Sequence, residues 1–322
     1  MTDQERGGPP APGPVPPAVQ RARWEALVGS GAPILADGAM GTMLFAAGLQ
    51  FGDPPEMWNL ALPQGSMVRQ IHRAYLDAGA RIILTNTFGG NRLRLSLHGN
   101  EGHVGEVNQM AAVLARAEID AASGSALVAG DIGPTGSLMF PMGLLEFDEA
   151  VDVFAEQARA LVAGGVDVIW IETMSDLEEI HAAITGVRRV APEIPIIATM
   201  TFDTRGHTMM GVPPERAVLA LAEWGANAIG GNCGNGPDEL IPVVAKMRAV
   251  APDVTLVGKS NAGMPELVDM KAVYRAEPSV MADYALEVRV AGATIIGGCC
   301  GSTPAHLAAM AAALGVRAPR GA

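Results

Sequence analysis

The sequence predicts an α/β protein of the (β/α)8 barrel (TIM barrel) class, formed by a single domain, and three observations support this. Eight short apolar segments alternate with eight longer amphipathic segments, which is the count of a (β/α)8 barrel. The short segments are almost continuously apolar, as parallel strands buried on both faces are. The chain has 322 residues, 49% of them hydrophobic, which is enough for one such barrel. A doubly wound sheet is the alternative, but that fold usually has fewer strands.

The elements are predicted in alternating order along the chain. The predicted strands are 34–37, 81–87, 126–132, 166–173, 194–202, 226–233, 255–261 and 293–300. The predicted helices are 66–78, 104–122, 148–163, 176–190, 214–224, 237–250, 279–291 and 304–314. Several helical segments begin with Asp, Ser or Pro, which are helix-start signals. A Gly or an Ala-Gly pair often precedes the next strand, as helix C-terminal caps do.

Residues 1–20 differ in composition from the rest of the chain, being rich in Pro and Gly and almost free of large apolar side chains. Such a segment buries too little surface to offset its ordering entropy. We therefore expect a disordered tail over 1–20, followed by one barrel domain over 21–322.

Charge and apolar run lengths limit the partners and the compartment. The chain has 34 acidic and 22 basic residues, a net charge of −12, without a dense Lys/Arg run. Nucleic acid and anionic membrane surfaces are therefore poor partners. No apolar run reaches the roughly 18 residues of a membrane-spanning helix, and the N-terminus lacks the regions of a signal peptide. We expect a cytoplasmic protein, and assembly into a homo-oligomer stays open.

The three cysteines lie in two glycine-framed segments, with Cys233 in GGNCG and Cys299 and Cys300 in GGCCG. An odd count with two adjacent members argues against disulfides. Thiolates are soft ligands that select zinc, copper(I) or iron–sulfur clusters. Three thiolates meeting from two strand ends would form an open tetrahedral zinc site with its fourth position free for substrate. Such a site favours alkyl transfer to a sulfur over hydrolysis.

Other interpretations of the cysteines stay open at this point. They could be three buried free thiols, since free Cys is a frequently buried residue. A three-cysteine iron–sulfur cluster is a rival metal site, although the Cys-x-x-Cys spacing is absent. One cysteine could be a covalent nucleophile, but no His lies in either segment to act as its base.

Polar residues follow the apolar run of each predicted strand, where barrel active sites lie. Helix capping explains Asp203 and is an alternative for Asp131. It does not explain Glu172, which directly follows Val-Ile-Trp-Ile. Because a buried carboxylate needs a cationic partner, Glu172 is predicted to bind a cation, with a structural ion pair as the alternative.

The sequence resembles the homocysteine S-methyltransferase family of zinc-dependent barrel enzymes over almost its whole length after the tail. The segments that carry the resemblance are 37–42 (DGAMGT), 85–90 (TNTFGG), 130–136 (GDIGPTG), 172–173 (ET), 232–233 (NC), 261–263 (NAG) and 297–301 (GGCCG). Within the family it is most similar to bacterial betaine–homocysteine methyltransferases and to the N-terminal module of cobalamin-dependent methionine synthase.

The resemblance implies a role for each matching residue. It implies that Cys233, Cys299 and Cys300 bind one zinc ion and that the sulfur of L-homocysteine completes its coordination. It further implies that Glu172 and Asp37 are the catalytic-site acids and that they bind the substrate amino acid. Gly38 and Thr85 are implied at the same amino-acid end, and Asn261 is implied at the open zinc position when substrate is absent.

The resemblance leaves the methyl donor open, with betaine as the first candidate. Animal betaine-using members carry tyrosines at the positions of Gly89 and Thr173, and a trimethylammonium group is usually held by aromatic side chains. The alternatives are S-methylmethionine, S-adenosylmethionine, or methylcobalamin or methylfolate delivered by a partner protein. In that last case the chain would be the homocysteine-activating subunit of a split methionine synthase. A further alternative to an enzyme is a non-catalytic module with a structural metal.

Overall fold

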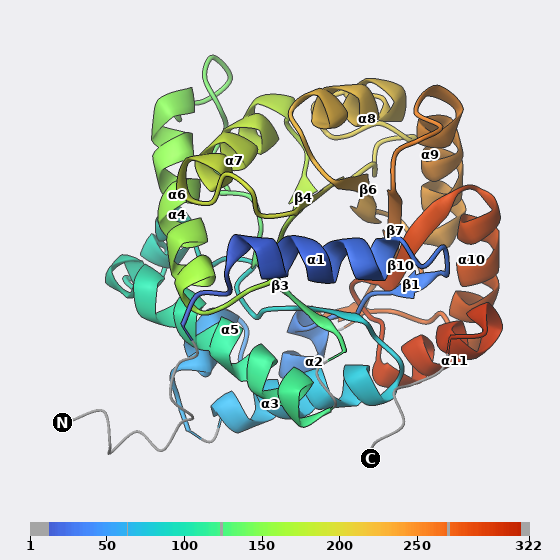
Figure 1. Cartoon of the computed structure of the whole chain (residues 1–322), viewed down its shortest axis with the longest axis horizontal. Helices are drawn as coiled ribbons and strands as arrows, with labels where there is room; N and C mark the ends of the chain where they lie inside the picture. The colour runs from blue at the N-terminus through green and yellow to red at the C-terminus, as the bar shows by residue number, and fades with distance from the viewer. Residues whose placement is uncertain (1–12, 63, 123–124, 269–270, 317–322) are drawn as a thin grey trace.

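The computed structural model describes residues 13–62, 64–122, 125–268 and 271–316, and its centre is a ring of eight parallel strands (Figure 1). The strands are β1 (Ile34–Leu35), β2 (Ile82–Leu84), β3 (Leu127–Ile132), β4 (Val168–Met174), β5 (Ile196–Met200), β6 (Ala228–Cys233), β7 (Leu256–Ser260) and β10 (Ala293–Gly298). They pair in the order β1-β10-β7-β6-β5-β4-β3-β2. A parallel bridge between Ala36 and Ile82 joins the two end strands. The (β/α)8 barrel prediction is confirmed, and the doubly wound alternative is wrong because the sheet closes.

Helices surround the ring in the predicted positions. They are α3 (Gln64–Asp77), α5 (Val104–Ala121), α6 (Phe147–Ala163), α7 (Leu177–Val190), α8 (Pro214–Glu223), α9 (Pro237–Val250), α10 (Pro278–Val290) and α11 (Pro304–Leu314). The predicted helix bounds agree with these to within two residues. Elements that the sequence did not predict lie in the loops, namely α2 (Gly41–Ala46), η2 (Pro55–Asn59), α4 (Arg92–Ser96), η3 (Glu101–His103), β8 (Glu266–Val268) and β9 (Lys271–Val273).

The N-terminal boundary of the domain needs a correction. Helix α1 (Pro17–Val28) begins inside the predicted tail of 1–20, with a proline at its first position, where no backbone N–H is needed. Gln20 is buried and donates to the Val166 carbonyl at 2.8 Å, and Trp24 packs into the barrel interior. The helix therefore lies across one end of the barrel (Figure 1). The predicted disorder of residues 1–12 lies outside the described residues.

Two apolar layers follow from the alternation of side chains along each strand. The inner layer fills the barrel with one or two residues from every strand, together with Trp24. The outer layer joins the opposite strand faces to the surrounding helices. On β4, Val168 and Trp170 belong to the inner layer, so the same alternation directs Glu172 into the barrel mouth.

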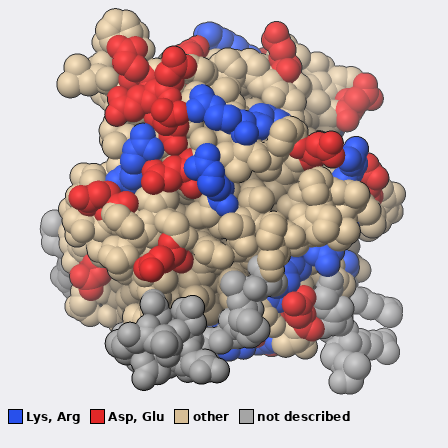
Figure 2. Space-filling model, turned by 60° about the vertical axis from the view of Figure 1, so that its left-hand side comes forward, with Lys and Arg blue, Asp and Glu red and all other residues tan. Residues whose placement is uncertain are grey.

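The surface drawn in Figure 2 carries acidic side chains beside Lys and Arg side chains. On this face several acidic side chains of the described residues gather at the upper left, and the Lys and Arg side chains do not form one continuous basic surface. None of the helices in the described part of the chain is long and apolar enough to cross a membrane.

Candidate active site

The three cysteine thiols converge at the carboxyl ends of β6 and β10. Their Sγ atoms all lie within 4.8 Å of one another, and Cys233 Sγ is 2.7 Å from Cys299 Sγ. Cys299 is buried, while Cys233 and Cys300 are half-buried, so the cluster opens toward the barrel mouth. Two glycine-framed segments far apart in the sequence thus supply one compact group of sulfurs.

Backbone turns at both strand ends aim these sulfurs at one point. Neighbouring side chains in a strand point to opposite faces, but β10 ends at Gly298, before the two adjacent cysteines. Ser302 then donates to the Cys299 carbonyl from its N–H at 3.1 Å and from its hydroxyl at 2.7 Å. Gly301 adopts a φ of +79°, which favours glycine. A Cβ there would lie 2.2 Å from Cγ of Tyr274, so this glycine also makes room for a side chain beside the cluster.

Asn232 supports the cluster from the preceding strand position. Its Nδ2 donates to Cys233 Sγ at 3.4 Å and to the Thr173 hydroxyl at 2.7 Å, and lies 4.0 Å from Cys299 Sγ. Its Oδ1 accepts from the Thr173 N–H at 2.9 Å. Thr173 and Cys233 have φ values of +62° and +58°, which are strained for residues with a side chain. One buried amide therefore links two strained strand ends.

Contacts among the three thiols shift their pKa values in opposite directions. Hydrogen bonds from Cys233 and Cys299 lower the pKa of Cys300 to about 3. The hydrogen bond with Cys299, followed by that with Cys300 and by burial, raises the pKa of Cys233 well above its usual range. One thiol of the cluster is therefore more acidic, and another less acidic, than a free cysteine.

The donor set fits a soft metal ion. Three sulfurs within reach of one centre match the ligands that zinc takes in its three-thiolate sites. Asn261 donates to the Gly234 carbonyl at 2.6 Å, directly after Cys233, but its buried Oδ1 accepts from no donor among the described residues. A buried amide oxygen without a partner is costly unless a donor or a cation meets it. Asn261 thus presents a free acceptor at the edge of the sulfur cluster.

Buried acids lie deeper in the barrel, around Lys259 of β7. Lys259 Nζ is 3.1 Å from Asp37 Oδ1 and 3.9 Å from Glu172 Oε2. Asp37 also accepts from the Leu84 N–H at 2.8 Å, which fixes its carboxylate against β2. The exposed fractions of Asp37, Glu172 and Lys259 are 2%, 8% and 3%. The alternative of a structural ion pair for Glu172 is thus partly realised, although the 3.9 Å separation is too long for a hydrogen bond.

Burial and Lys259 act in opposite directions on these acids. Burial raises the pKa of Glu172 to about 7, against the lowering effect of the Lys259 charge. Burial likewise raises the pKa of Asp37, again opposed by Lys259. Burial alone would lower the pKa of Lys259, but the Asp37 and Glu172 carboxylates raise it. The lysine is therefore charged, and each acid is easier to ionise because of it.

Asp131 is a member of this acidic group, and the capping alternative for it is wrong. Its side chain is buried, its Oδ1 accepts no hydrogen bond from a described residue, and no helix begins beside it. Burial, followed by the Glu172 charge, raises its pKa well above the usual range. Capping is also not the role of Asp203, whose Oδ1 accepts from the Thr204 hydroxyl at 3.1 Å.

Thr85 and Gly38 border the acidic group but differ in what they offer. The Thr85 hydroxyl accepts from the Asp131 N–H at 3.0 Å and contacts the Thr87 hydroxyl at 2.6 Å. Since the Thr87 hydroxyl donates to the Asp131 carbonyl at 2.7 Å, Thr85 donates its proton to Thr87. Its hydroxyl therefore ties β2 to β3. A Cβ on Gly38 would lie 2.7 Å from the Ser302 hydroxyl, so glycine allows this close packing beside Asp37.

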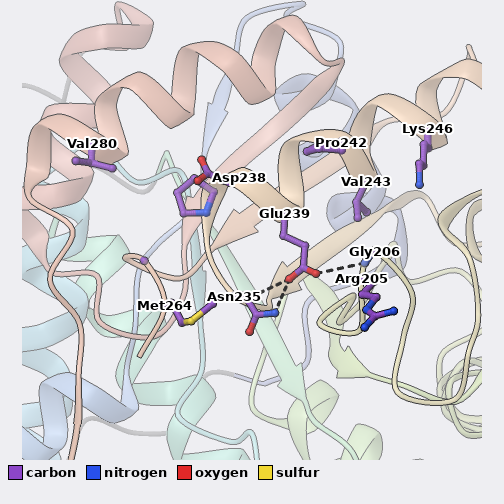
Figure 3. Close-up of a pocket in the computed structure, with 12 residues that line it drawn as sticks. Arg205, Gly206, Asn235, Asp238, Glu239, Pro242, Val243, Lys246, Met264 and Val280 are labelled. Atoms are coloured by element: carbon purple, nitrogen blue, oxygen red, sulfur yellow. Dashed lines mark hydrogen bonds between the residues drawn. The ribbon is translucent and has the colours of Figure 1, made fainter. Parts of the chain in front are cut away.

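A separate hollow of about 680 Å³ lies among the loops after β5, β6 and β7 (Figure 3). Its lining includes Arg205, Asp238, Lys246 and Met264. Glu239 is another lining residue, and it accepts from Asn235 Nδ2 at 2.7 Å and from the Gly206 N–H at 3.3 Å. The residues described as lining it include none of the predicted site residues. The hydrogen bonds of Glu239 therefore hold the loop after Cys233 in place. The candidate reactive groups are the cysteine sulfurs and the buried acids, which lie outside this hollow.

Comparisons with known proteins agree with this arrangement. The profile of the family described as homocysteine S-methyltransferase matches residues 34–314. Methionine synthases of Mycobacterium tuberculosis and Mycobacterium leprae are 33% and 32% identical over 296 residues, which cover 87% of this chain and 24% of each relative. The chain thus spans about a quarter of the length of these relatives. The metallated form of the homocysteine methyltransferase MmuM from Escherichia coli aligns with a TM-score of 0.75 at 25% identity, over 90% of this chain and 99% of that one.

A closed barrel with three thiols and a buried acidic group at the carboxyl ends of its strands defines the class, which is that of barrel enzymes with a sulfur-based site. The particular family follows from the profile match. The chain belongs to the homocysteine S-methyltransferase family, and with it to the methyltransferases.

Two parts of the site were missed by the sequence interpretation. Lys259 lies within a predicted apolar strand and receives no role from the sequence, and Asp131 is placed at a strand end with capping left open as an alternative. Alternation along β7 gives the signal, because Val257 belongs to the inner layer and Lys259 follows it by two residues. The same count on β3 leads from Ala129 to Asp131.

Proposed function

We propose that this protein transfers a methyl group to the sulfur of L-homocysteine and forms methionine, using zinc held by Cys233, Cys299 and Cys300. The observation that carries the proposal is the pairing of two unlike subsites in one barrel mouth. A cluster of thiols opens beside buried acids that have acceptor oxygens to spare. A substrate with a thiol at one end and an ammonium group at the other satisfies both.

The acids support binding of the amino-acid end. Glu172 Oε2 is buried and accepts no hydrogen bond from a described residue, and Asp37 has Lys259 as its cation. A buried carboxylate without a full partner strongly favours an incoming cation. The ammonium group of homocysteine would supply that cation and three N–H donors. Gly38, next to Asp37, is buried against Ser302 and Tyr75 and so fixes the backbone beside the acid in this region.

The three cysteines would hold the metal, with Asn232 donating to Cys233 Sγ and Asn261 Oδ1 as a free acceptor nearby. When bound, zinc with three thiolate ligands offers a fourth coordination position in which a thiol is held deprotonated. A free thiol has a pKa near ~8.5 and is mostly protonated at neutral pH. The residues of this chain contribute by fixing the sulfurs and by orienting the substrate through its ammonium group.

The transfer itself needs little further help from side chains. The substrate sulfur attacks the methyl carbon, the new S–CH3 bond forms as the bond between the methyl group and the donor breaks, and the donor leaves with that electron pair. Holding sulfur and methyl carbon together replaces a bimolecular encounter, and such positioning accounts for a large part of many rate enhancements.

Betaine is the donor to test first, although the tyrosine positions of the animal betaine-using members differ here. The Gly89 N–H donates to Glu56 Oε1 at 2.7 Å, and a Cβ on Gly89 would lie 2.9 Å from the same oxygen. A carboxylate thus lies directly against the position at which those relatives have a tyrosine. A carboxylate also attracts a cationic donor, so betaine, S-methylmethionine and S-adenosylmethionine are compared directly.

The identity with methionine synthases favours a second candidate, in which the chain accepts its methyl group from a carrier protein. In that case methylcobalamin or a methylfolate with its carrier would be the active donor. Methionine formation from homocysteine, measured with each donor in turn, separates the two candidates.

Metal and substrate binding test the site independently of the donor. Wild-type protein is expected to hold about one zinc ion per chain by elemental analysis. Each of Cys233→Ala, Cys299→Ala and Cys300→Ala should lose the metal and the activity, and retention of full zinc in all three would refute the site. Glu172→Ala should keep its zinc and require far more homocysteine, while loss of zinc in that variant would make Glu172 structural.

A further inference from the structure

Lys259 is an unusual residue for the interior of a barrel. The chain contains three lysines, at positions 246, 259 and 271. Lys259 lies on β7 with an exposed fraction of 3%, although lysine is rarely buried unless it is paired. Its ammonium group is 5.5 Å from the centre of the buried Trp170 ring. Gly297 on the neighbouring β10 leaves room for it, since a Cβ there would lie 3.2 Å from Lys259 Cγ.

The contacts of Lys259 are fewer than its donors. Its three N–H groups have one carboxylate oxygen within hydrogen-bond distance, Asp37 Oδ1 at 3.1 Å, and Glu172 Oε2 follows at 3.9 Å. The buried oxygens Glu172 Oε2 and Asp131 Oδ1 accept nothing from the described residues. Lys259 therefore has unpaired donors beside the unpaired acceptors of Glu172 and Asp131, as a binding site for a zwitterion requires.

The ionic cluster at the opposite end of the barrel shows what a purely structural arrangement looks like in this protein. Asp167, at the amino end of β4, is fully buried. One of its oxygens accepts from Arg23 at 2.6 Å, and the other accepts from Arg116 and from the Val128 N–H at 2.8 Å. Each oxygen of that acid has a partner, which Glu172 Oε2 and Asp131 Oδ1 near Lys259 lack among the described residues. A buried charge without its partner is strongly destabilising, so the unpaired oxygens near Lys259 are costly unless a ligand meets them.

We propose that Lys259 is a specificity residue that binds the α-carboxylate of the substrate, while the substrate ammonium group binds the free oxygens of Glu172 and its neighbours. This inference rests on the proposed function. In an α-amino acid the carboxylate and the ammonium share one carbon, so a ligand whose ammonium lies at Glu172 carries its carboxylate to the lysine beside it. Lys259 thereby makes the site select an amino-acid thiol over a simple amine thiol.

The test measures binding of three thiols to the zinc-loaded protein by titration calorimetry, which needs no methyl donor. The ligands are homocysteine, aminopropanethiol, which lacks the carboxylate, and mercaptobutanoic acid, which lacks the amine. Wild-type protein should bind homocysteine about 10- to 100-fold more tightly than aminopropanethiol, the range expected for a hydrogen bond to a charged group. Lys259→Met should reduce homocysteine affinity by a similar factor and leave aminopropanethiol affinity unchanged.

The controls separate a binding role from a structural one. Lys246→Met removes another lysine, on the exposed face of α9, and should change neither affinity. Lys259→Gln keeps polar N–H donors, so it serves if the Met variant does not fold, and the wild-type comparison needs no variant at all. Zinc content is measured in each sample, because a loss of metal would lower the affinity for all three thiols together.

Three results would overturn the inference and leave the proposed function standing. They are equal wild-type affinities for homocysteine and aminopropanethiol, an equal loss for both thiols in Lys259→Met, and tighter homocysteine binding in that variant. The last result would mean that Lys259 competes with the substrate ammonium for the acids. Failure of the wild-type protein to bind homocysteine overturns both proposals.

Discussion

Replacing Asn232 by alanine should weaken metal binding and folding through different contacts of one amide. Asn232 is buried, with an exposed fraction of 1%. Its Oδ1 is the acceptor of the Thr173 N–H at 2.9 Å, and its Nδ2 donates to Cys233 Sγ at 3.4 Å. Alanine removes these contacts, together with the donation from Nδ2 to the Thr173 hydroxyl at 2.7 Å, and adds no charge. The effects on folding and on metal binding can therefore be measured on one variant.

The expected magnitudes follow from those contacts. A buried N–H left without its acceptor costs about 1–3 kcal/mol. Because Thr173 is only half-buried, we expect the lower end of that range for the free energy of unfolding of the metal-free protein. Loss of a hydrogen bond to a metal ligand typically reduces metal affinity about 10- to 100-fold. The decrease in zinc affinity is therefore the larger effect relative to wild type.

Zinc affinity is measured by competition with a chromogenic chelator, and stability by urea unfolding of the metal-free protein. Asn108→Ala is the matched control, since Asn108 is also fully buried and donates to the Gly90 and Val104 carbonyls at 2.8 Å, away from the cysteines. It should lower stability and leave zinc affinity unchanged. If Asn232→Ala keeps wild-type zinc affinity while its stability falls, Asn232 only joins two strands and the reasoning is wrong.

Four further predictions concern charge, backbone and packing. Burial raises the pKa of Glu172 to about 7, and a neutral acid does not pair with an ammonium group. Calorimetry should therefore show homocysteine affinity falling as the pH drops through 7. Glu172→Gln should bind homocysteine weakly and without that pH dependence. The same raised pKa makes the metal-free protein less stable as the pH rises, which is opposite to its effect on homocysteine affinity. The stabilising contribution of Glu172 is complete below the ordinary pKa of 4.5 and is lost as the pH rises through about 7. Urea midpoints measured across that range should therefore fall with pH, and midpoints that rise would contradict the reasoning. Gly301→Ala combines a φ of +79° with a Cβ 2.2 Å from Tyr274, so its urea midpoint should fall by at least the equivalent of about 1–3 kcal/mol, and an unchanged midpoint would show that the backbone there can relax. Trp24→Ala should cost about 3–5 kcal/mol of unfolding free energy and keep full zinc content, whereas loss of zinc would link α1 to the opposite end of the barrel.

The barrel could be predicted from sequence because buried parallel strands leave a strong pattern of apolar segments between amphipathic ones. The strand ends were less predictable, since the predicted strand 81–87 ends at Leu84 in the structure. There the hydroxyls of Thr85 and Thr87 take over the bonding to Asp131, a side-chain role that propensity does not express. The start of α1 was also not predicted. A proline suits the first turn of a helix, but Pro17 follows several other prolines, so it does not stand out as a helix start.

The sulfur half of the site could be predicted because its residue types are rare in this chain and their glycine neighbours are distinctive. The charged half was harder to predict, because it depends on which strands are adjacent. Lys259 reaches Asp37 only because β10, the neighbour of β7, also pairs with β1, the strand that precedes Asp37. Strand order is a property of the closed barrel, so a single strand containing a lysine does not reveal the partner.

The two ends of the barrel divide stability from function by how completely their polar groups are satisfied. At the amino end, both Asp167 oxygens have partners, and α1 covers the interior with Trp24. At the carboxyl end, Thr173 and Cys233 have strained φ values, and Glu172 keeps a buried oxygen without a donor among the described residues. Strained and unpaired groups persist only where surrounding structure holds them. The paired groups at the amino end therefore help the fold to tolerate the strained and unpaired groups at the carboxyl end. Substrate and metal are expected to stabilise the carboxyl end more than the amino end.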